Sequence, residues 1–260
     1  MSKNFELLQR VAKNDYFSVP DGPVPAPEKA PAVVSFKKES ADLEIPKLVQ
    51  LKKEPPDPEI TKLVQRLFLQ AGKESGPKVV SFSGIARDDR SSWICARAGE
   101  ILAEQADTSV CMVEANFWSP QLHLHSAAAN PIGFAEALTT KGPIRNFAIQ
   151  LGGRNLWLIP SGLVKPGFYP SIERYRDRFA ELRESFDYIL ISAPALSRET
   201  EVTFIGQLAD GIVLIVEANH NRRETVRRAK EQLEIAKVQL IGAVLDQRTF
   251  PIPEKLYQRL

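Results

Sequence analysis

The chain has 260 residues, of which 43% are hydrophobic and 25% are charged. This composition is typical of one globular α/β domain with an added segment, and the net charge of +2 does not favour binding to nucleic acid or to an anionic membrane surface. No apolar run approaches the ~20 residues of a membrane helix, and the N-terminus lacks the apolar core of a signal peptide. We expect a cytoplasmic protein that reaches a membrane only through a partner.

The first 57 residues differ in composition from the rest. Nine of the 19 prolines occur at or before Pro58. Proline fixes φ and removes a hydrogen-bond donor, so this stretch is unsuited to a sheet or to a long helix. We expect a mostly disordered arm over residues 1–57, in which residues 1–13 form either a short docking helix or a frayed terminus, followed by an α/β domain over residues 58–260.

From residue 58 onward, helical patterns alternate with short apolar runs. The expected elements are a helix at 58–71, a strand at 79–83, a helix at 92–105, a strand at 110–114, a helix at 133–139, a strand at 156–160, a helix at 171–185, a strand at 188–191, a helix at 201–208, a strand at 211–216, a helix at 222–236 and a strand at 240–245. In the helix at 171–185, an apolar side should contain Ile172, Tyr175, Phe179 and Leu182.

Continuous apolar strands separated by helices predict a doubly wound, mostly parallel sheet that is covered on both faces. Ligands of such sheets bind beyond the carboxyl ends of the strands. We therefore expect residues 84–91, 114–118 and 192–196 to converge at one edge of the sheet and to form the functional site.

The two cysteines and the paired histidines give no metal signal. Cys95 and Cys111 have no metal-binding or redox spacing and are expected to be buried thiols in a reducing cytoplasm. His123 and His125 lie near no cluster of carboxylates or cysteines, so we expect no metal site there.

The turn after the first strand has the layout of a phosphate-binding loop, Gly-x-x-x-x-Gly-Lys-Ser/Thr, which leads from a strand into a helix. Gly84 and Ser91 keep the first glycine and the hydroxyl. Asp89 and Arg90 replace the second glycine and the lysine. Ser91 and the following Ser92 are also suited to begin the helix. The scaffold of a nucleotide site is therefore predicted, with altered groups at two positions.

At three strand ends the sequence resembles the bacterial tyrosine kinases (BY-kinases), which are cytoplasmic P-loop proteins related to the MinD/ParA ATPases. The family's loop, approximately Ser-Ala-x-Pro-Gly-Glu-Gly-Lys-Ser-Thr, falls on residues 83–92. Its motif Asp-x-Asp-x-x-x-Pro-x-Leu-His falls on 114–123, and its strand ending Ile-Ile-Asp-Thr-Pro-Pro falls on 189–195. The resemblance covers roughly residues 58–247. It implies a P-loop fold, ATP and magnesium as cofactors, and work with a membrane-spanning polysaccharide copolymerase in capsule and exopolysaccharide export.

Several positions depart from this family. Glu114, Asn116 and Ser192 stand where the family has aspartates for metal binding and acid/base work, and Asp246 stands where an asparagine would meet the nucleobase. Asp89 places a negative charge beside the phosphates, which costs ~1 kcal/mol at ~4 Å in water and ~4 kcal/mol at an effective dielectric of 20. Mg²⁺ prefers octahedral oxygen ligands, many of which are carboxylates. Since the family's aspartates are replaced and Asp89 repels the phosphates, we expect ATP and magnesium to bind weakly or not at all.

The phosphate-loop arginine and the remaining motifs also depart from the family. Arg90 can bind phosphate as a fork, but it is longer than lysine and planar, so it fits a tight loop poorly. Glu59 and Lys62 fall on the family's subunit-contact helix and are candidates for pairing with a second copy. The family's C-terminal tyrosine cluster is reduced to Tyr257.

Two roles are considered for each of the tryptophans and for the last helix. Trp93 and Trp118 flank the expected pocket, where they either pack as core or lid residues or fill the space of a nucleotide. The basic helix at 222–236 is expected to be a solvated face with an ion pair between Glu224 and Arg228, rather than a nucleic-acid contact.

Three hypotheses follow. The first is a non-catalytic regulatory or scaffold protein, a degenerate BY-kinase whose partner is a membrane polysaccharide copolymerase or an active kinase paralogue at the inner face of the membrane. The second is a working ATP-dependent tyrosine kinase in which Arg90 replaces the lysine. The third is a ParA/MinD-like positioning protein, which requires a basic or amphipathic C-terminal helix that residues 251–257 are too short and proline-rich to supply.

Overall fold

The computed structural model describes residues 57–69, 76–86, 90–122, 132–152, 155–164, 168–197 and 199–247. The predictions for residues 1–56, Asp89, His123, His125 and Tyr257 lie outside these ranges. The elements are α2 (Pro58–Phe68), β1 (Val79–Gly84), α3 (Ser91–Gln105), β2 (Val110–Glu114), α5 (Phe134–Thr139), η1 (Ile144–Phe147), β3 (Ile149–Leu151), β4 (Leu156–Ile159), α6 (Ile172–Ser185), β5 (Tyr188–Ser192), α7 (Glu199–Leu208), β6 (Gly211–Glu217), α8 (Arg223–Ile235) and β7 (Leu240–Asp246).

The strands form one sheet in the order β3-β4-β2-β5-β1-β6-β7. Every neighbouring pair is parallel except β3 with β4, which is antiparallel. The expected mostly parallel, doubly wound sheet is therefore confirmed. The sequence did not predict η1 and β3, because a four-residue and a three-residue element are too short to show a period.

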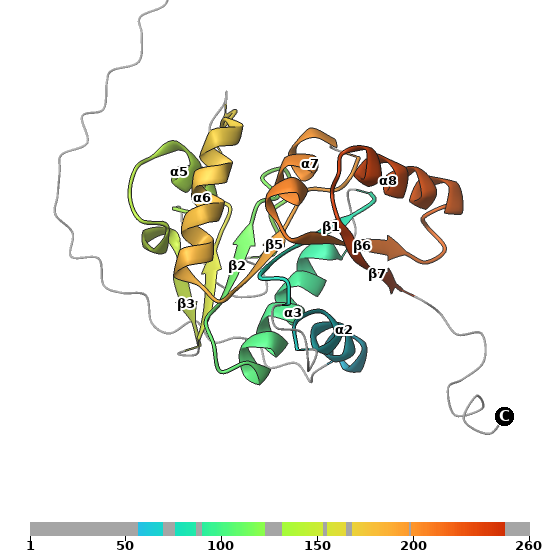
Figure 1. Cartoon of the computed structure of the whole chain (residues 1–260), viewed down its shortest axis with the longest axis horizontal. Helices are drawn as coiled ribbons and strands as arrows, with labels where there is room; N and C mark the ends of the chain where they lie inside the picture. Colours follow the sequence, from blue (N-terminus) through green and yellow to red (C-terminus); the bar gives the residue numbers. More distant parts are fainter. Residues whose placement is uncertain are drawn as a thin grey trace, which may run out of the picture. The chain divides into compact units, whose positions relative to one another are not determined.

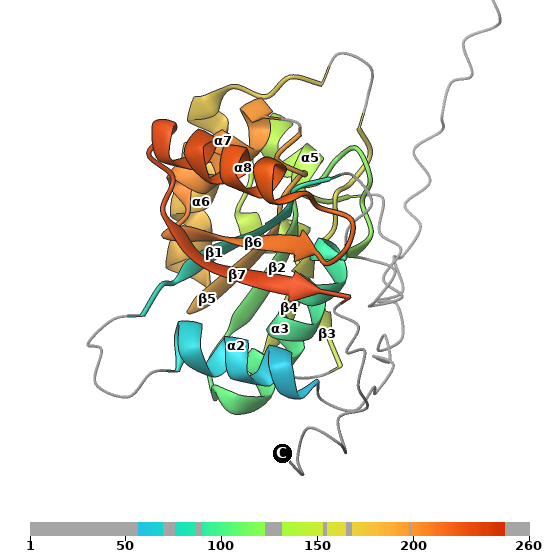
Figure 2. The ribbon, with the colours of Figure 1, turned by 90° about the vertical axis from the view of Figure 1, so that its right-hand side faces the viewer.

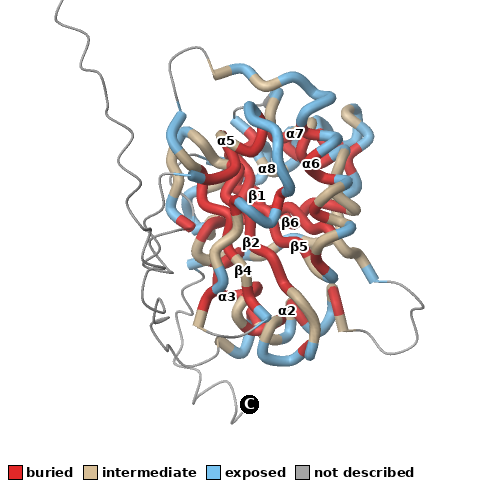
Figure 3. The backbone as a smooth tube through the Cα atoms, turned by 90° about the vertical axis from the view of Figure 1, so that its left-hand side faces the viewer, coloured by how far each residue is buried: buried red, intermediate tan, exposed pale blue. Residues whose placement is uncertain are grey.

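Helices cover both faces of the sheet, with α2 and α3 on one face and α5 to α8 on the other (Figures 1 and 2). Side chains of each strand alternate between these two cores. In β1, Val79 packs with the α5–α8 side, whereas Val80 and Phe82 pack with α2 and α3. The central strands are buried along their lengths (Figure 3), which explains why their sequences are continuous apolar runs.

Two helices show how local sequence sets element ends. α2 begins at Pro58, whose missing N–H costs nothing at that position, and Asp57 Oδ1 accepts hydrogen bonds from the N–H groups of Glu59 at 2.9 Å and Ile60 at 3.4 Å. In α6 the predicted apolar side is buried at all but one position. Ile172 is 37% exposed, which corrects the prediction, because it is the first residue of the helix and lies beyond the packed turns.

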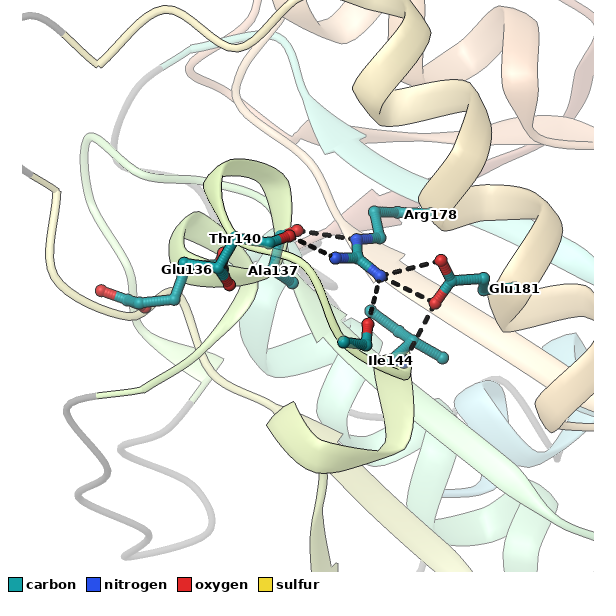
Figure 4. Close-up of polar contacts among 7 residues, drawn as sticks. Glu136, Ala137, Thr140, Ile144, Arg178 and Glu181 are labelled. Atoms are coloured by element: carbon teal, nitrogen blue, oxygen red, sulfur yellow. Dashed lines mark hydrogen bonds and ion pairs between the residues drawn. The ribbon is translucent and has the colours of Figure 1, made fainter.

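The six-residue helix α5 is capped at its start by its own Glu136 and is held at its end by a side chain from α6. At its C-terminal side, the buried Arg178 of α6 donates to the carbonyl oxygens of Ala137 at 2.6 Å, Thr140 at 2.7 Å and Gly142 at 2.7 Å (Figure 4). Glu181 pairs with the same guanidinium at 2.8 Å. Since the last carbonyl groups of a helix have no partner within the helix, this arginine satisfies them and fixes α5 to α6.

Candidate functional site

The three predicted segments converge at the carboxyl edge of the sheet. β1 ends at Gly84 between the ends of β5 and β6, and the chain then enters α3 at Ser91. The N–H of Leu196 donates to the Gly84 carbonyl at 2.9 Å, and the N–H of Ala115 donates to the Ser192 carbonyl at 2.9 Å. These bonds tie the segments after β1, β2 and β5 together. The described residues include the strand and the helix that flank the expected phosphate loop, and residues 87–89 between them lie outside the described ranges.

Two buried serines meet beneath the start of α3. The hydroxyl oxygens of Ser92 and Ser192 are 2.9 Å apart and share a hydrogen bond. Ser92 is 4% exposed and Ser192 is 0% exposed. Ser92 was predicted to belong to the phosphate loop, and Ser192 was predicted to belong to the third family motif. The two residues are in contact through their neutral hydroxyl groups.

Glu114 at the end of β2 is fully buried and bonded to its own loop. Its Oε2 accepts hydrogen bonds from the N–H groups of Leu122 at 2.7 Å and Gln121 at 2.9 Å, and its Oε1 accepts one from Asn116 at 3.2 Å. Burial raises the pKa of Glu114 from 4.5 to about 7, although hydrogen bonds from these N–H groups and from Ser192 oppose the rise. The carboxylate organises residues 115–122 and is turned away from solvent.

Arg90 reaches across the edge of the sheet. Its Nη1 lies 3.2 Å from Asp246 Oδ1 at the end of β7, and its guanidinium lies 3.9 Å from the centre of the Trp93 ring. β7 is two strands away from β1, which is roughly 10 Å at the usual strand spacing. Arg90 and Asp246, which the sequence analysis predicted for the lysine and nucleobase positions, therefore form an ion pair. The Arg90 side chain is 42% exposed and that of Asp246 is 11% exposed.

A small polar cavity of about 10 Å³ lies beside the start of α3, which is room for about one water molecule. Asn116 and Ser119 bond to each other across its rim, since Asn116 Nδ2 donates to the Ser119 carbonyl and the Ser119 N–H donates to Asn116 Oδ1, both at 3.2 Å. The described residues that line it carry no charge: Ala86, Ser91, Ser92, Asn116, Ser119, Gln121 and Ala195.

The tryptophans lie outside the lining of this cavity. The ring of Trp93 packs against the guanidinium of Arg90. Trp118 is 50% exposed, and its Nε1 donates to Glu201 Oε2 at 2.8 Å. The sequence predicted that Trp93 and Trp118 lie near the site. It did not predict the Arg90–Asp246 pair, because no sequence pattern links positions that are 156 residues apart.

The other predicted residues have simple surroundings. Glu59 and Lys62 pair with each other at 2.8 Å on the exposed side of α2. Cys95 and Cys111 are buried, as predicted, and burial raises the pKa of both thiols. Among the described residues, no three His, Cys, Asp or Glu side chains gather as a metal site. Within the same ranges, no helix combines the length and the apolar character that a bilayer crossing requires.

No protein-family model matches the chain. Among curated proteins, it is 22% identical over 171 residues to the tyrosine-protein kinase YwqD of Bacillus subtilis, which covers 65% of the chain and 72% of that protein. It is 24% identical over 179 residues to the tyrosine-protein kinase CpsD of Streptococcus agalactiae, which covers 68% of the chain and 77% of that protein.

Solved structures share the fold. The VpsO kinase domain superposes with a TM-score of 0.65 at 15% identity, covering 74% of this chain and 94% of that one. The septum site-determining protein MinD of Pyrococcus horikoshii superposes with a TM-score of 0.56 at 16% identity, covering 70% and 76%. The chain is therefore related in sequence to bacterial tyrosine kinases (BY-kinases), and it shares the fold of solved BY-kinase domains and MinD-type proteins.

Proposed function

We propose that this chain is a non-catalytic member of the BY-kinase family, a regulatory or scaffold component of exopolysaccharide or capsule biosynthesis and export. The observation that carries the proposal is the surroundings of Glu114. The carboxylate at the family's first acidic position has both oxygens bonded to backbone N–H groups and is fully buried. It presents no open oxygen to a magnesium ion at the sheet edge.

Two further contacts support the same function. A lysine in the place of Arg90 would act as a point charge on the phosphates. Arg90 instead lies against Asp246 and Trp93, on the side of the edge away from the small cavity. Ser192 supplies a neutral hydroxyl, bonded to Ser92, where the family has an aspartate. Phosphoryl transfer depends on charge at these positions, because catalysis is largely positioning and electrostatic stabilisation.

A retained fold with replaced chemical groups suits docking to other proteins. We propose a membrane polysaccharide copolymerase or an active kinase paralogue as the partner, with the chain in the cytoplasm at the inner face of the membrane. Contact with a second copy would use Glu59 and Lys62, which are 81% and 59% exposed on α2.

Calorimetric titration of the full chain with Mg·ATP tests the proposal. We expect no saturable heat at millimolar nucleotide and no release of phosphate, whereas Bacillus subtilis YwqD, measured in parallel, serves as the positive control. A thermal-shift titration provides a second readout, since a ligand that binds the native state raises the melting temperature.

Millimolar or tighter binding with turnover would contradict the proposal and support a working tyrosine kinase with a variant loop. The observation that favours this alternative is the start of α3 at Ser91, which directs helix N–H groups toward the loop. In that case, Arg90→Ala should abolish phosphate release, while Arg66→Ala on the exposed side of α2 should not.

A further inference from the structure

A groove lies between α8 and β7, on the face of the sheet that α5 to α8 cover. Its volume is about 540 Å³, which is within the range of small-molecule sites. It shares no lining residue with the cavity beside the start of α3, so it is a separate feature. The apolar side chains that line it come from β6, α8 and β7: Leu214, Val216, Val226, Leu240, Ala243 and Leu245.

The position of α8 explains why this apolar surface is open. α8 packs its buried residues Ala229 and Leu233 into the core on this face of the sheet. β7 is the last strand of the sheet, and among the described strands only β6 pairs with it. Leu245 is consequently 55% exposed. A concave apolar surface of this kind is typical of a binding site.

The groove also carries positive charge. Arg223, Arg227 and Lys230 lie at i, i+4 and i+7 on one side of α8, so all three line the groove. The acidic lining residue is Glu217, which is 15% exposed and lies 3.3 Å from His220 Nδ1.

The nearby acidic residues of α8 weaken these cations only partly. Arg227 pairs with Glu224 at 3.4 Å and with Glu231 at 3.5 Å, Lys230 pairs with Glu234 at 3.3 Å, and the side chains of Arg227 and Lys230 are 68% and 59% exposed. Exposed pairs of this kind are weak and exchange readily. The start of α8, beside Arg223, adds the positive end of the helix dipole to the same end of the groove.

We propose that this groove binds one anionic amphiphile, a molecule with an unbranched apolar body and a single carboxylate, sulfate or phosphate head. The body lies on the floor formed by Val216, Val226 and Leu245, and the head lies beside Arg223 and Arg227. The ligand comes from solution as a single molecule, because acidic residues alternate with basic ones on α8 and make the helix unsuited to a flat anionic bilayer. This inference is independent of the nucleotide chemistry of the chain.

Calorimetry with sodium decanoate, below its micelle-forming concentration, tests the proposal on the full chain. We expect one saturable site, with each added methylene of the carboxylate series tightening binding by up to about fourfold. The uncharged 1-decanol and the cationic decyltrimethylammonium ion should each bind at least about tenfold more weakly, since they lack the charge-assisted bonds to arginine.

Variants locate the site. Leu245→Asp should abolish decanoate binding, and Arg227→Glu should weaken it about tenfold or more. Both residues are largely exposed, so the fold should be retained, which circular dichroism checks. The matched controls are Leu163→Asp and Arg66→Glu, two exposed residues of the same types elsewhere, which should leave binding unchanged.

Five results would overturn the proposal, and the first four concern the choice of ligand and the position of the site. The first three are the absence of saturable decanoate binding, equal binding of decanoate and decanol, and binding that survives Leu245→Asp. The fourth is binding to vesicles of phosphatidylglycerol without binding to single decanoate molecules. Decanoate binding that appears only after residues 248–260 are removed would assign the groove to that segment and overturn the proposal as well.

Discussion

Buried Glu114 should make the stability of the protein depend on pH. Its pKa is about 7 in the folded state, compared with an ordinary value of 4.5. A carboxyl group whose folded pKa is raised stabilises the fold when protonated. That contribution is fully present below pH ~4.5 and is lost as the pH rises through about 7.

The size of the effect follows from the two pKa values. One pKa unit corresponds to about 1.4 kcal/mol, so the full contribution is roughly 3 kcal/mol, of which about 2.5 kcal/mol is lost between pH 5 and pH 8. The carboxylates with lowered pKa values, such as Asp187 and Asp210, act in the opposite direction but at more acid pH. The interval from pH 5 to pH 8 therefore lies above the range in which these two aspartates contribute, and the comparison with Glu114→Gln assigns the remaining dependence to Glu114.

Urea denaturation of the wild type and of Glu114→Gln over this interval measures the effect. The amide of the variant stays neutral and can keep the two hydrogen bonds from the N–H groups of Gln121 and Leu122. The free energy of unfolding of the variant should therefore lose this pH dependence. Relative to wild type, the variant should become more stable as the pH rises. Glu59→Gln, at an exposed position, is the control and should follow the wild type. Parallel pH curves for wild type and Glu114→Gln would refute the assigned role of burial.

The remaining predictions concern other contacts. Arg178→Ala should lower the free energy of unfolding by about 3–5 kcal/mol in urea, because it leaves buried carbonyl groups without donors, whereas an exposed arginine of α6 should tolerate the same change. A double-mutant cycle of Arg90→Ala and Asp246→Ala should give a coupling below about 1 kcal/mol, since Arg90 is 42% exposed; a value of several kcal/mol would contradict the assigned exposure. Gly162→Ala should lower the melting temperature, because φ there is 77° and the left-handed region costs a non-glycine residue about 1–2 kcal/mol; an unchanged melting temperature would show that the turn relaxes.

The sequence predicted the parts of the fold that depend on local patterns. Apolar runs such as Val110–Glu114 identified the buried parallel strands, because a strand covered on both faces is apolar throughout. The order of motifs along the chain predicted which strand ends converge, because parallel strands bring their carboxyl ends to one edge. The ion pair between Glu224 and Arg228, 3.4 Å apart, was predicted by helical spacing alone and is confirmed.

Contacts between segments that are distant along the chain were decided by the tertiary structure. The Arg90–Asp246 pair joins the start of α3 to β7, and Arg178 of α6 closes α5, although no local pattern indicates the partner of either arginine. The groove beside β7 likewise depends on where α8 lies on the sheet. The physical reason is that helical and strand periods record only whether a side chain faces inward. Which charge it meets there is set by the packing of several elements together.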